Sequence, residues 1–187
     1  DPQICANILC PPPTFRSFQY CATGYNSDLK TISRKLVMSA YREFGLGPTY
    51  NSPFWSVTRK LEKALNIDRC SCAWTNINKY DENQGRPKKT VRDQLETLDP
   101  LLLEEIKILK PEICVFFVGP RYHKRLMKIF PDVELIEITG WKRNALTQLK
   151  HPLLPESTFV TYHPKYLRIS GLEANFIRFF EKFQIKK

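Results

Sequence analysis

The sequence predicts an α/β fold in which helices and a parallel sheet form layers. A nearly continuous apolar run, residues 112–118, lies between Pro111 and Gly119-Pro120, as is typical of a strand buried on both faces. Segments with helical spacing alternate with β-prone segments along the chain. The chain has 187 residues, 42% of them hydrophobic, which suits one ordinary domain. No repeat or linker divides it, so we expect a single domain over residues 1–187.

The residue pattern in the first third of the chain predicts an extended N-terminal segment, a strand and two helices. Residues 1–16 contain three consecutive prolines and no periodicity, and we expect an extended lead-in. Alternation over residues 17–22 predicts a first strand, followed by a turn-rich loop. Apolar residues at helical spacing over 32–44 predict a helix. Ser52 and Pro53 suit the N-cap and the first position of the next helix.

The middle of the chain predicts a short strand and the longest helix. Residues 72–75 are β-prone and lead into Asn76. A polar, basic loop follows, with Lys88 and Lys89 near its end. Apolar residues in helical register predict a helix over 90–110, kinked or restarted at Pro100 with Asp99 as its cap.

The last third continues the alternation beyond the apolar run. We expect a basic helix over 122–130, a strand over 133–138, a long connection over 140–156, a strand over 158–161 and a closing helix over 172–183.

Composition favours a polyanionic partner. Lys and Arg number 29 and Asp and Glu 19, a net charge of +10, which points to nucleic acid or, alternatively, to a surface that keeps the protein soluble. No apolar run approaches the ~20 residues that span a bilayer, and no signal peptide is recognisable. The six cysteines match no usual zinc spacing. We expect reduced thiols, a buried Cys114, and neither a metal nor a cofactor, although a metal cluster stays an alternative.

The most informative stretch is the end of the last predicted strand, at His163-Pro164. Pro164 removes a backbone donor and stops the strand, so His163 leaves its carboxyl end, where ligands bind in α/β sheets. Lys165, Tyr166, Leu167 and Arg168 follow. Aromatic and cationic side chains beside a titratable ring suit a polyanion. The alternative is a surface turn in which the histidine caps a neighbouring helix.

Other strand ends carry polar side chains that suit a nucleobase. Asn26 and Asp28 follow the predicted first strand, and Asn76 follows the second. An Asn amide pairs with a base edge through its donor and its acceptor, and an aromatic ring stacks on a base face. Phe54 and Trp55 open the helix beside them. The alternatives are core packing for both aromatics and a strand-end cap for Asn76.

From about Asn51 to the C-terminus the sequence resembles the uracil-DNA glycosylase superfamily. The resemblance lies in the order and spacing of four segments, residues 51–55, 74–79, 110–120 and 161–167. It implies a three-layer α/β/α fold with a central four-stranded parallel sheet between the helices. It also implies a nucleotide flipped out of the base stack. Phe54 would stack on the base, Asn76 would read its edge, and His163 would stabilise charge on the departing base. Asn26 or Asp28 would direct the attacking water, and Tyr166, Leu167 and Arg168 would lie on a loop that enters the duplex and grips phosphate.

Two functions follow as hypotheses. The first is a DNA glycosylase that hydrolyses the N-glycosidic bond of uracil or another altered base. The second is a catalytically weak nucleic-acid-binding protein, a damage sensor or a regulatory subunit. Both hypotheses predict that the partner is DNA, single- or double-stranded, and that Lys165, Lys88 and Lys89 make further DNA contacts. Both also predict a monomer that is found in the cytoplasm, nucleoid or nucleus. An esterase-like or nuclease-like enzyme is disfavoured, because no nucleophile elbow or carboxylate cluster occurs.

Overall fold

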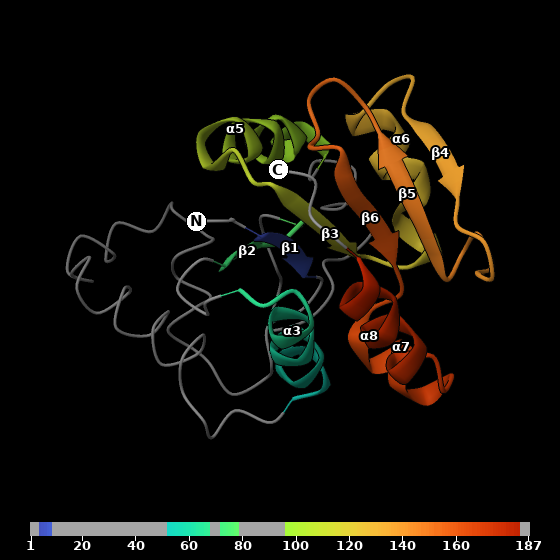
Figure 1. Cartoon of the computed structure of the whole chain (residues 1–187). Coiled ribbons are helices and arrows are strands. Elements are labelled where there is room, and N and C mark those ends of the chain that lie inside the picture. Colours follow the sequence, from blue (N-terminus) through green and yellow to red (C-terminus); the bar gives the residue numbers. More distant parts are fainter. Residues whose placement is uncertain (1–3, 9–51, 68–71, 79–95, 184–187) are drawn as a thin grey trace.

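The computed structural model describes residues 4–8, 52–67, 72–78 and 96–183 (Figure 1). Within these residues one sheet has six strands in the order β2-β1-β3-β6-β5-β4. The strands are β1 (Ile4–Ile8), β2 (Cys72–Thr75), β3 (Ile113–Phe117), β4 (Glu134–Glu137), β5 (Leu146–Lys150) and β6 (Ser157–Thr161). The helices are α3 (Pro53–Ala64), α5 (Asp99–Leu109), α6 (His123–Ile129), α7 (Pro164–Ile169) and α8 (Glu173–Lys182), with short 3₁₀ turns η3 (Glu96–Leu98) and η4 (Pro120–Tyr122).

The predicted central four-stranded parallel sheet is wrong, because the sheet is mixed. β2, β1, β3 and β6 run parallel, but β5 pairs antiparallel with both β6 and β4. Of the strands β3, β6, β5 and β4, only the pair β3–β6 is parallel. The cause is β5, which lies inside the segment 140–156 that we expected to be a connection. It continues the sheet beyond β6 and reverses the strand direction there.

A second correction concerns the start of the chain. Ile4–Ile8 lies within the predicted lead-in, yet it forms β1, which pairs with β2 on one side and β3 on the other. Three consecutive prolines shortly after it dominate the sequence signal and hide a strand of five residues. The strand predicted over 17–22, the helix over 32–44 and the basic loop before residue 90 fall outside the described residues.

β3 is the centre of the core. All five of its residues are buried, and alternate side chains enter two separate apolar clusters. Ile113, Val115 and Phe117 face α3, α7 and α8, whereas Cys114 and Phe116 face α5 and α6. Figure 1 shows these two groups of helices on opposite sides of the sheet. The expected burial of Cys114 is therefore confirmed.

Local signals explain where the helices begin. The Ser52 hydroxyl accepts a hydrogen bond from the Trp55 N–H, 3.3 Å away, and Pro53 fills the first helical position of α3, as predicted. α5 restarts at Asp99, also as predicted, but Asp99 is not its cap. Leu98 holds the N-cap position without a side-chain hydrogen bond, and the Asp99 carboxylate binds Arg125 instead.

Replacing Phe117 tests the role of β3. This side chain is fully buried, and its ring lies between those of Phe54 and Phe176, at centroid distances of 6.0 and 5.8 Å. We expect Phe117→Ala to lower the free energy of unfolding by about 3–5 kcal/mol in urea denaturation. The control Ile108→Ala removes an apolar side chain that is 77% exposed and should cost about 0.5 kcal/mol or less. A loss below 1 kcal/mol for Phe117→Ala would contradict this account of the core.

Candidate functional site

The carboxyl ends of the four parallel strands meet at one edge of the sheet, the carboxyl edge. Thr161, the last residue of β6, accepts backbone hydrogen bonds from Val118 (3.2 Å) and Gly119 (3.0 Å), which follow β3. Gly119 has a φ of +65°, a conformation that glycine adopts without a steric penalty. Because Leu146 pairs with Thr161 in antiparallel register, the β4–β5 connection reaches the same edge. Asn76, Gly119, His163 and residues 138–145 therefore surround one end of the molecule.

His163 caps helix α7, and this contact fixes the ring. Its Nδ1 accepts a hydrogen bond from the Lys165 N–H at 3.2 Å. Burial, and secondly the charge of Lys165, lower the pKa of His163 from its ordinary value of 6.5. The ring is therefore neutral near pH 7. Since Nδ1 is the acceptor, the neutral ring carries its proton on Nε2.

A neutral imidazole in this state is a hydrogen-bond donor with no net charge. Within the described part of the chain the Nε2–H has no hydrogen-bond partner, so it is available to an added group. A fixed donor of this kind stabilises negative charge that develops on a departing atom. Both predicted readings of His163 are thus compatible, because one ring nitrogen caps a helix while the other remains free.

Asn76 follows β2 at the same edge and carries an unpaired acceptor. Its side-chain oxygen is buried and has no hydrogen-bond partner among the described residues. Leaving such an oxygen unpaired costs about 1–3 kcal/mol, so these positions normally receive water or a ligand. Asn76 and His163 are separated by β1 and β3, that is, by three inter-strand spacings or roughly 14 Å.

A largely buried ion pair between α5 and α6 holds the segment that follows β2. Arg125 binds Asp99 through Nε at 2.9 Å, and both side chains are 12% exposed. The same guanidinium donates to the Asn78 side-chain oxygen at 2.6 Å and to the Ile77 carbonyl at 3.1 Å. The Asn78 amide in turn donates to the Tyr122 hydroxyl at 3.3 Å. Ile77 and Asn78 are therefore tied to α6 and to Tyr122, which follows β3.

The two predicted stacking aromatics lie in the core. Phe54 and Trp55 are 6% and 5% exposed and occupy the first turn of α3. Their rings meet edge to face at 5.0 Å, and Trp55 meets Trp74 in the same way at 5.5 Å. Core packing, the alternative weighed above, describes these contacts. Stacking of Phe54 on a base stays a prediction.

The segment expected to be a duplex-entering loop is helix α7. Leu167 is fully buried in the core and offers no surface to a ligand, because the helical turn directs it inward. Arg168 donates from Nε to Glu173 at 2.8 Å and from Nη2 to Ser56 at 3.0 Å, so its charge is partnered within the protein. Lys165 and Tyr166 are exposed. Asn26, Asp28, Lys88 and Lys89 lie outside the described residues.

Sequence reasoning missed a groove of about 590 Å³ beside His163, here called the aromatic-basic groove. It lies between the β4–β5 connection, the end of β6, α7 and α8. Neither Asn76 nor His163 is among its lining residues, but two neighbours of His163 are. Its aromatic side chains are Trp141, Tyr162, Tyr166 and Phe179, and its cations are Lys142, Arg178 and Lys182. The signal available in the sequence was the pair of basic residues Lys142 and Arg143, which follows Trp141.

A search against models of known protein families finds no match to this chain. Among the residues that the structure describes, no helix is both long and apolar enough to cross a membrane. In that same part of the chain, no group of three or more His, Cys, Asp or Glu side chains is placed to hold a metal ion.

Breaking the Arg125–Asp99 pair should destabilise the site and the fold together. Arg125→Met leaves a buried carboxylate without its partner, and we expect the free energy of unfolding to fall by about 3–5 kcal/mol in urea denaturation. The double variant Arg125→Met/Asp99→Leu should recover much of that loss. Lys128→Met removes the exposed pair with Glu96 and should cost about 0–1 kcal/mol. Equal losses for Arg125→Met and Lys128→Met would contradict the role of the buried pair.

The protonation of His163 is open to direct measurement. Titration of its Cε1–H signal by NMR, assigned from the spectrum of His163→Gln, should give a pKa below 6.5. The folded pKa is lower than the unfolded one, so the unfolded chain binds the proton more tightly. The stability contributed by this ring is therefore complete above pH 6.5 and is lost as pH falls through the folded pKa. A pKa at or above 6.5 would remove the argument for a neutral donor.

Proposed function

We propose that the protein is a DNA glycosylase that releases uracil or another altered base, with His163 as the hydrogen-bond donor to the departing base. The observation that carries the proposal is the state of His163 at the carboxyl edge. Its ring is held by the Lys165 N–H, its pKa is lowered, and its Nε2–H is free within the described residues. The resemblance of four sequence segments to the uracil-DNA glycosylase superfamily agrees with this role.

The chemistry needs a donor of this kind. When the bond between C1′ and the base nitrogen breaks, its electron pair stays on the base and the sugar becomes oxocarbenium-like. Negative charge spreads to a base oxygen, where the Nε2–H donates a hydrogen bond. Water then adds to C1′, one of its protons finally resides on the free base, and an abasic sugar remains. His163 stays neutral throughout and transfers no proton.

Asn76 supplies the second part of the proposed pocket. Its unpaired buried oxygen suits a donor on a base edge, and its amide nitrogen suits an adjacent acceptor. The Arg125 network fixes the segment that carries it. A water-directing role for Asn26 or Asp28 stays a prediction. The mixed sheet differs from the fold that the resemblance implies, so the proposal rests on the site and on the net charge of +10.

A specific observation favours the second function, a nucleic-acid-binding protein without strong catalysis. Phe54 and Leu167, which would stack on the base and enter the duplex, both lie in the core. The aromatic-basic groove nevertheless offers a surface for nucleic acid. Such a protein would bind DNA in a salt-sensitive manner and release no base.

Base release can be measured on oligonucleotides that contain uracil, hypoxanthine or a bulky modified pyrimidine, with abasic sites scored by alkaline strand cleavage. We expect release on at least one substrate, and a loss of about 10²- to 10³-fold in rate for His163→Ala with DNA binding retained. Thermal melting would establish that the variant is folded.

His151→Ala is the matched control, because His151 is also followed by proline and its Nδ1 also accepts a backbone N–H two residues on, from Leu153 at 3.2 Å. It follows β5 at the opposite edge of the sheet, so its replacement should leave base release unchanged. Binding without release on any substrate would favour the second function. An absence of both binding and release would exclude both.

A further inference from the structure

We propose that the aromatic-basic groove binds an unpaired stretch of the DNA strand next to the target nucleotide, so that the protein prefers single-stranded to duplex DNA. This inference rests on the proposed function for its link to His163, but binding in the groove is measurable without any catalysis. It assigns a partner to a surface that sequence reasoning did not find.

The groove begins beside His163. Tyr162 precedes His163 in the chain and Tyr166 follows it. The centroids of the two tyrosine rings are 4.7 Å apart, and the rings meet edge to face. Both line the groove, and Tyr166 is 51% exposed. A DNA strand bound in the groove would therefore pass beside His163, the proposed hydrogen-bond donor. The connection between β4 and β5, which lies at the same edge, forms the opposite wall with Trp141 and Lys142.

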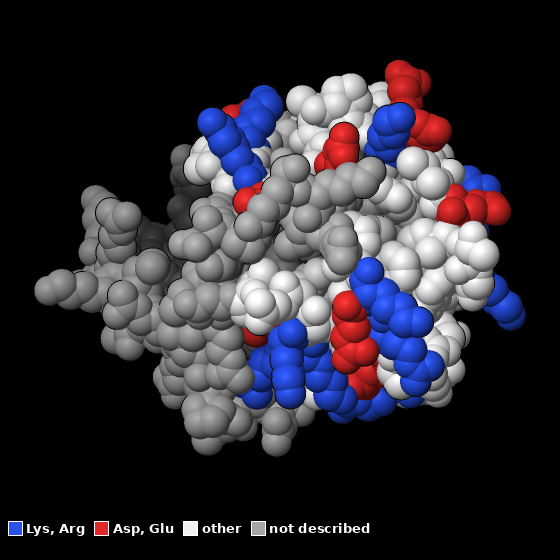
Figure 2. All heavy atoms as spheres, in the orientation of Figure 1, with Lys and Arg blue, Asp and Glu red and all other residues white. Residues whose placement is uncertain are grey.

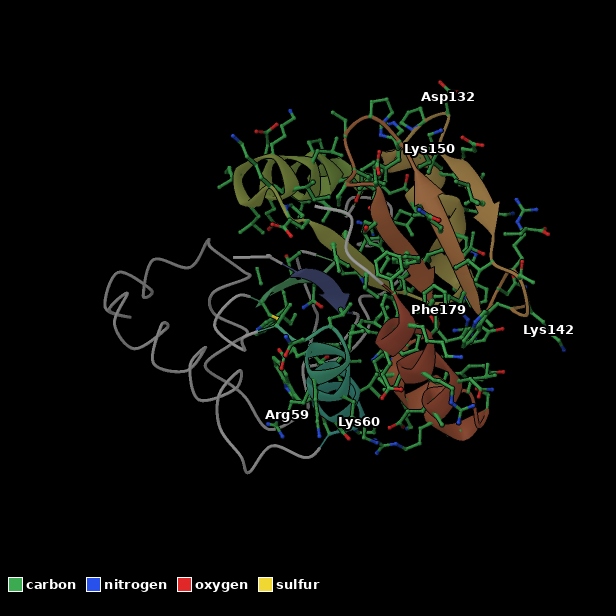
Figure 3. All side chains as sticks on the ribbon, in the orientation of Figure 1. Arg59, Lys60, Asp132, Lys142, Lys150 and Phe179 are labelled. Atoms are coloured by element: carbon green, nitrogen blue, oxygen red, sulfur yellow. The ribbon has the colours of Figure 1, made fainter. Side chains whose placement is uncertain are left out.

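Aromatic side chains line the walls of the groove. Trp141 meets Phe179 of α8 edge to face, with the ring centroids 6.4 Å apart, and both are half-buried. Figure 3 shows Lys142 extending outward from the β4–β5 connection, while Phe179 lies close to the sheet. Such rings bind bases by stacking with little dependence on sequence. Stacking on a protein ring requires a free base face, which a duplex does not offer.

The groove carries positive charge from the residues that the structure describes. Lys142, Arg178 and Lys182 line it, no Asp or Glu does, and none of the three has an ion-pair partner among the described residues. A neighbouring hollow on α7 and α8 differs, because Glu173 and Glu181 line it together with Lys60 and Arg168. Figure 2 shows acidic atoms among the basic ones on the face that carries α3, α7 and α8. Phosphates are thus better accommodated in the aromatic-basic groove than along Arg168.

Size points in the same direction. A volume of about 590 Å³ lies within the range of roughly 300–1,000 Å³ that holds a small ligand. It accommodates one or two nucleotides of a single strand but not both strands of a helix. Cations together with an exposed aromatic ring, here that of Tyr166, are the usual composition of sites for single strands.

Binding of a fluorescent oligothymidylate, measured by anisotropy over a range of salt concentrations, tests the proposal. We expect the single strand to bind at least 10-fold more tightly than a duplex of equal length. The variant Lys142→Gln/Arg178→Gln/Lys182→Gln should bind more weakly. Each lost phosphate contact should reduce the slope of log K against log salt by roughly 0.7, so the loss of three contacts should reduce it by about 2. Tyr166→Ala should weaken binding by about 5- to 150-fold, the range for one stacked base.

A charge-matched control is available at the opposite edge of the sheet. Lys107→Gln/Lys110→Gln/Lys150→Gln removes the same charge from exposed positions remote from the groove, and Figure 3 shows Lys150 at the far end from Lys142. It should change the salt slope much less than the groove variant. Equal slopes for the two triple variants would overturn the proposal.

Competition identifies other occupants. Tighter binding of single-stranded RNA, of polyglutamate or of vesicles containing anionic lipid than of the oligothymidylate would also overturn the proposal, as would equal affinity for duplex and single strand. The two proposals fail separately. Binding in the groove without base release would refute the glycosylase and support the single-strand site. Base release from duplex DNA that the groove variants leave unchanged would refute the single-strand site and support the glycosylase.

Discussion

The complete burial of β3 is the constraint on which the other elements depend. Its five residues alternate between two apolar clusters, so helices must cover the sheet on both sides. α3, α7 and α8 protect one face, and α5 and α6 protect the other. Parallel pairing with β6 then brings Gly119 beside the Thr161 carbonyl and places His163 at the carboxyl edge. The candidate site is therefore a consequence of how this strand is buried.

Elements with strong local signals were predictable from the sequence. The apolar run of β3, the Ser52-Pro53 start of α3 and the His-Pro end of β6 each depend on a few adjacent residues, and all three predictions are confirmed. β5 carries no comparable signal. Its five residues, Leu146–Lys150, become a strand because β6 and β4 pair with them, and the direction of that pairing is set by tertiary contacts. The mixed sheet was therefore beyond the reach of local pattern.

The parts of the candidate site also differ in whether local sequence or tertiary contacts determine them. His163 was predictable, because a strand that ends at His-Pro marks a carboxyl edge by itself. The aromatic-basic groove was not, since Trp141, Tyr162 and Phe179 come from three segments that meet only when β5 runs back along β6. Phe54 shows the converse. An aromatic at a helix start is equally suited to a base or to a core, and only the contacts with Trp55 and Phe117 distinguish them.

His163 and the groove would divide the work of the proposed enzyme. In that enzyme, cations and stacking rings would hold phosphates and flanking bases equally well before and during bond cleavage, and would therefore lower KM and leave kcat unchanged. The Nε2–H of His163 would donate a stronger hydrogen bond only as charge develops on the base, and would therefore raise kcat. A neutral ring suits this role, because an imidazolium would also bind the ground-state phosphates. Burial and the charge of Lys165 lower the pKa of His163 and so keep the ring neutral, as the proposed role requires.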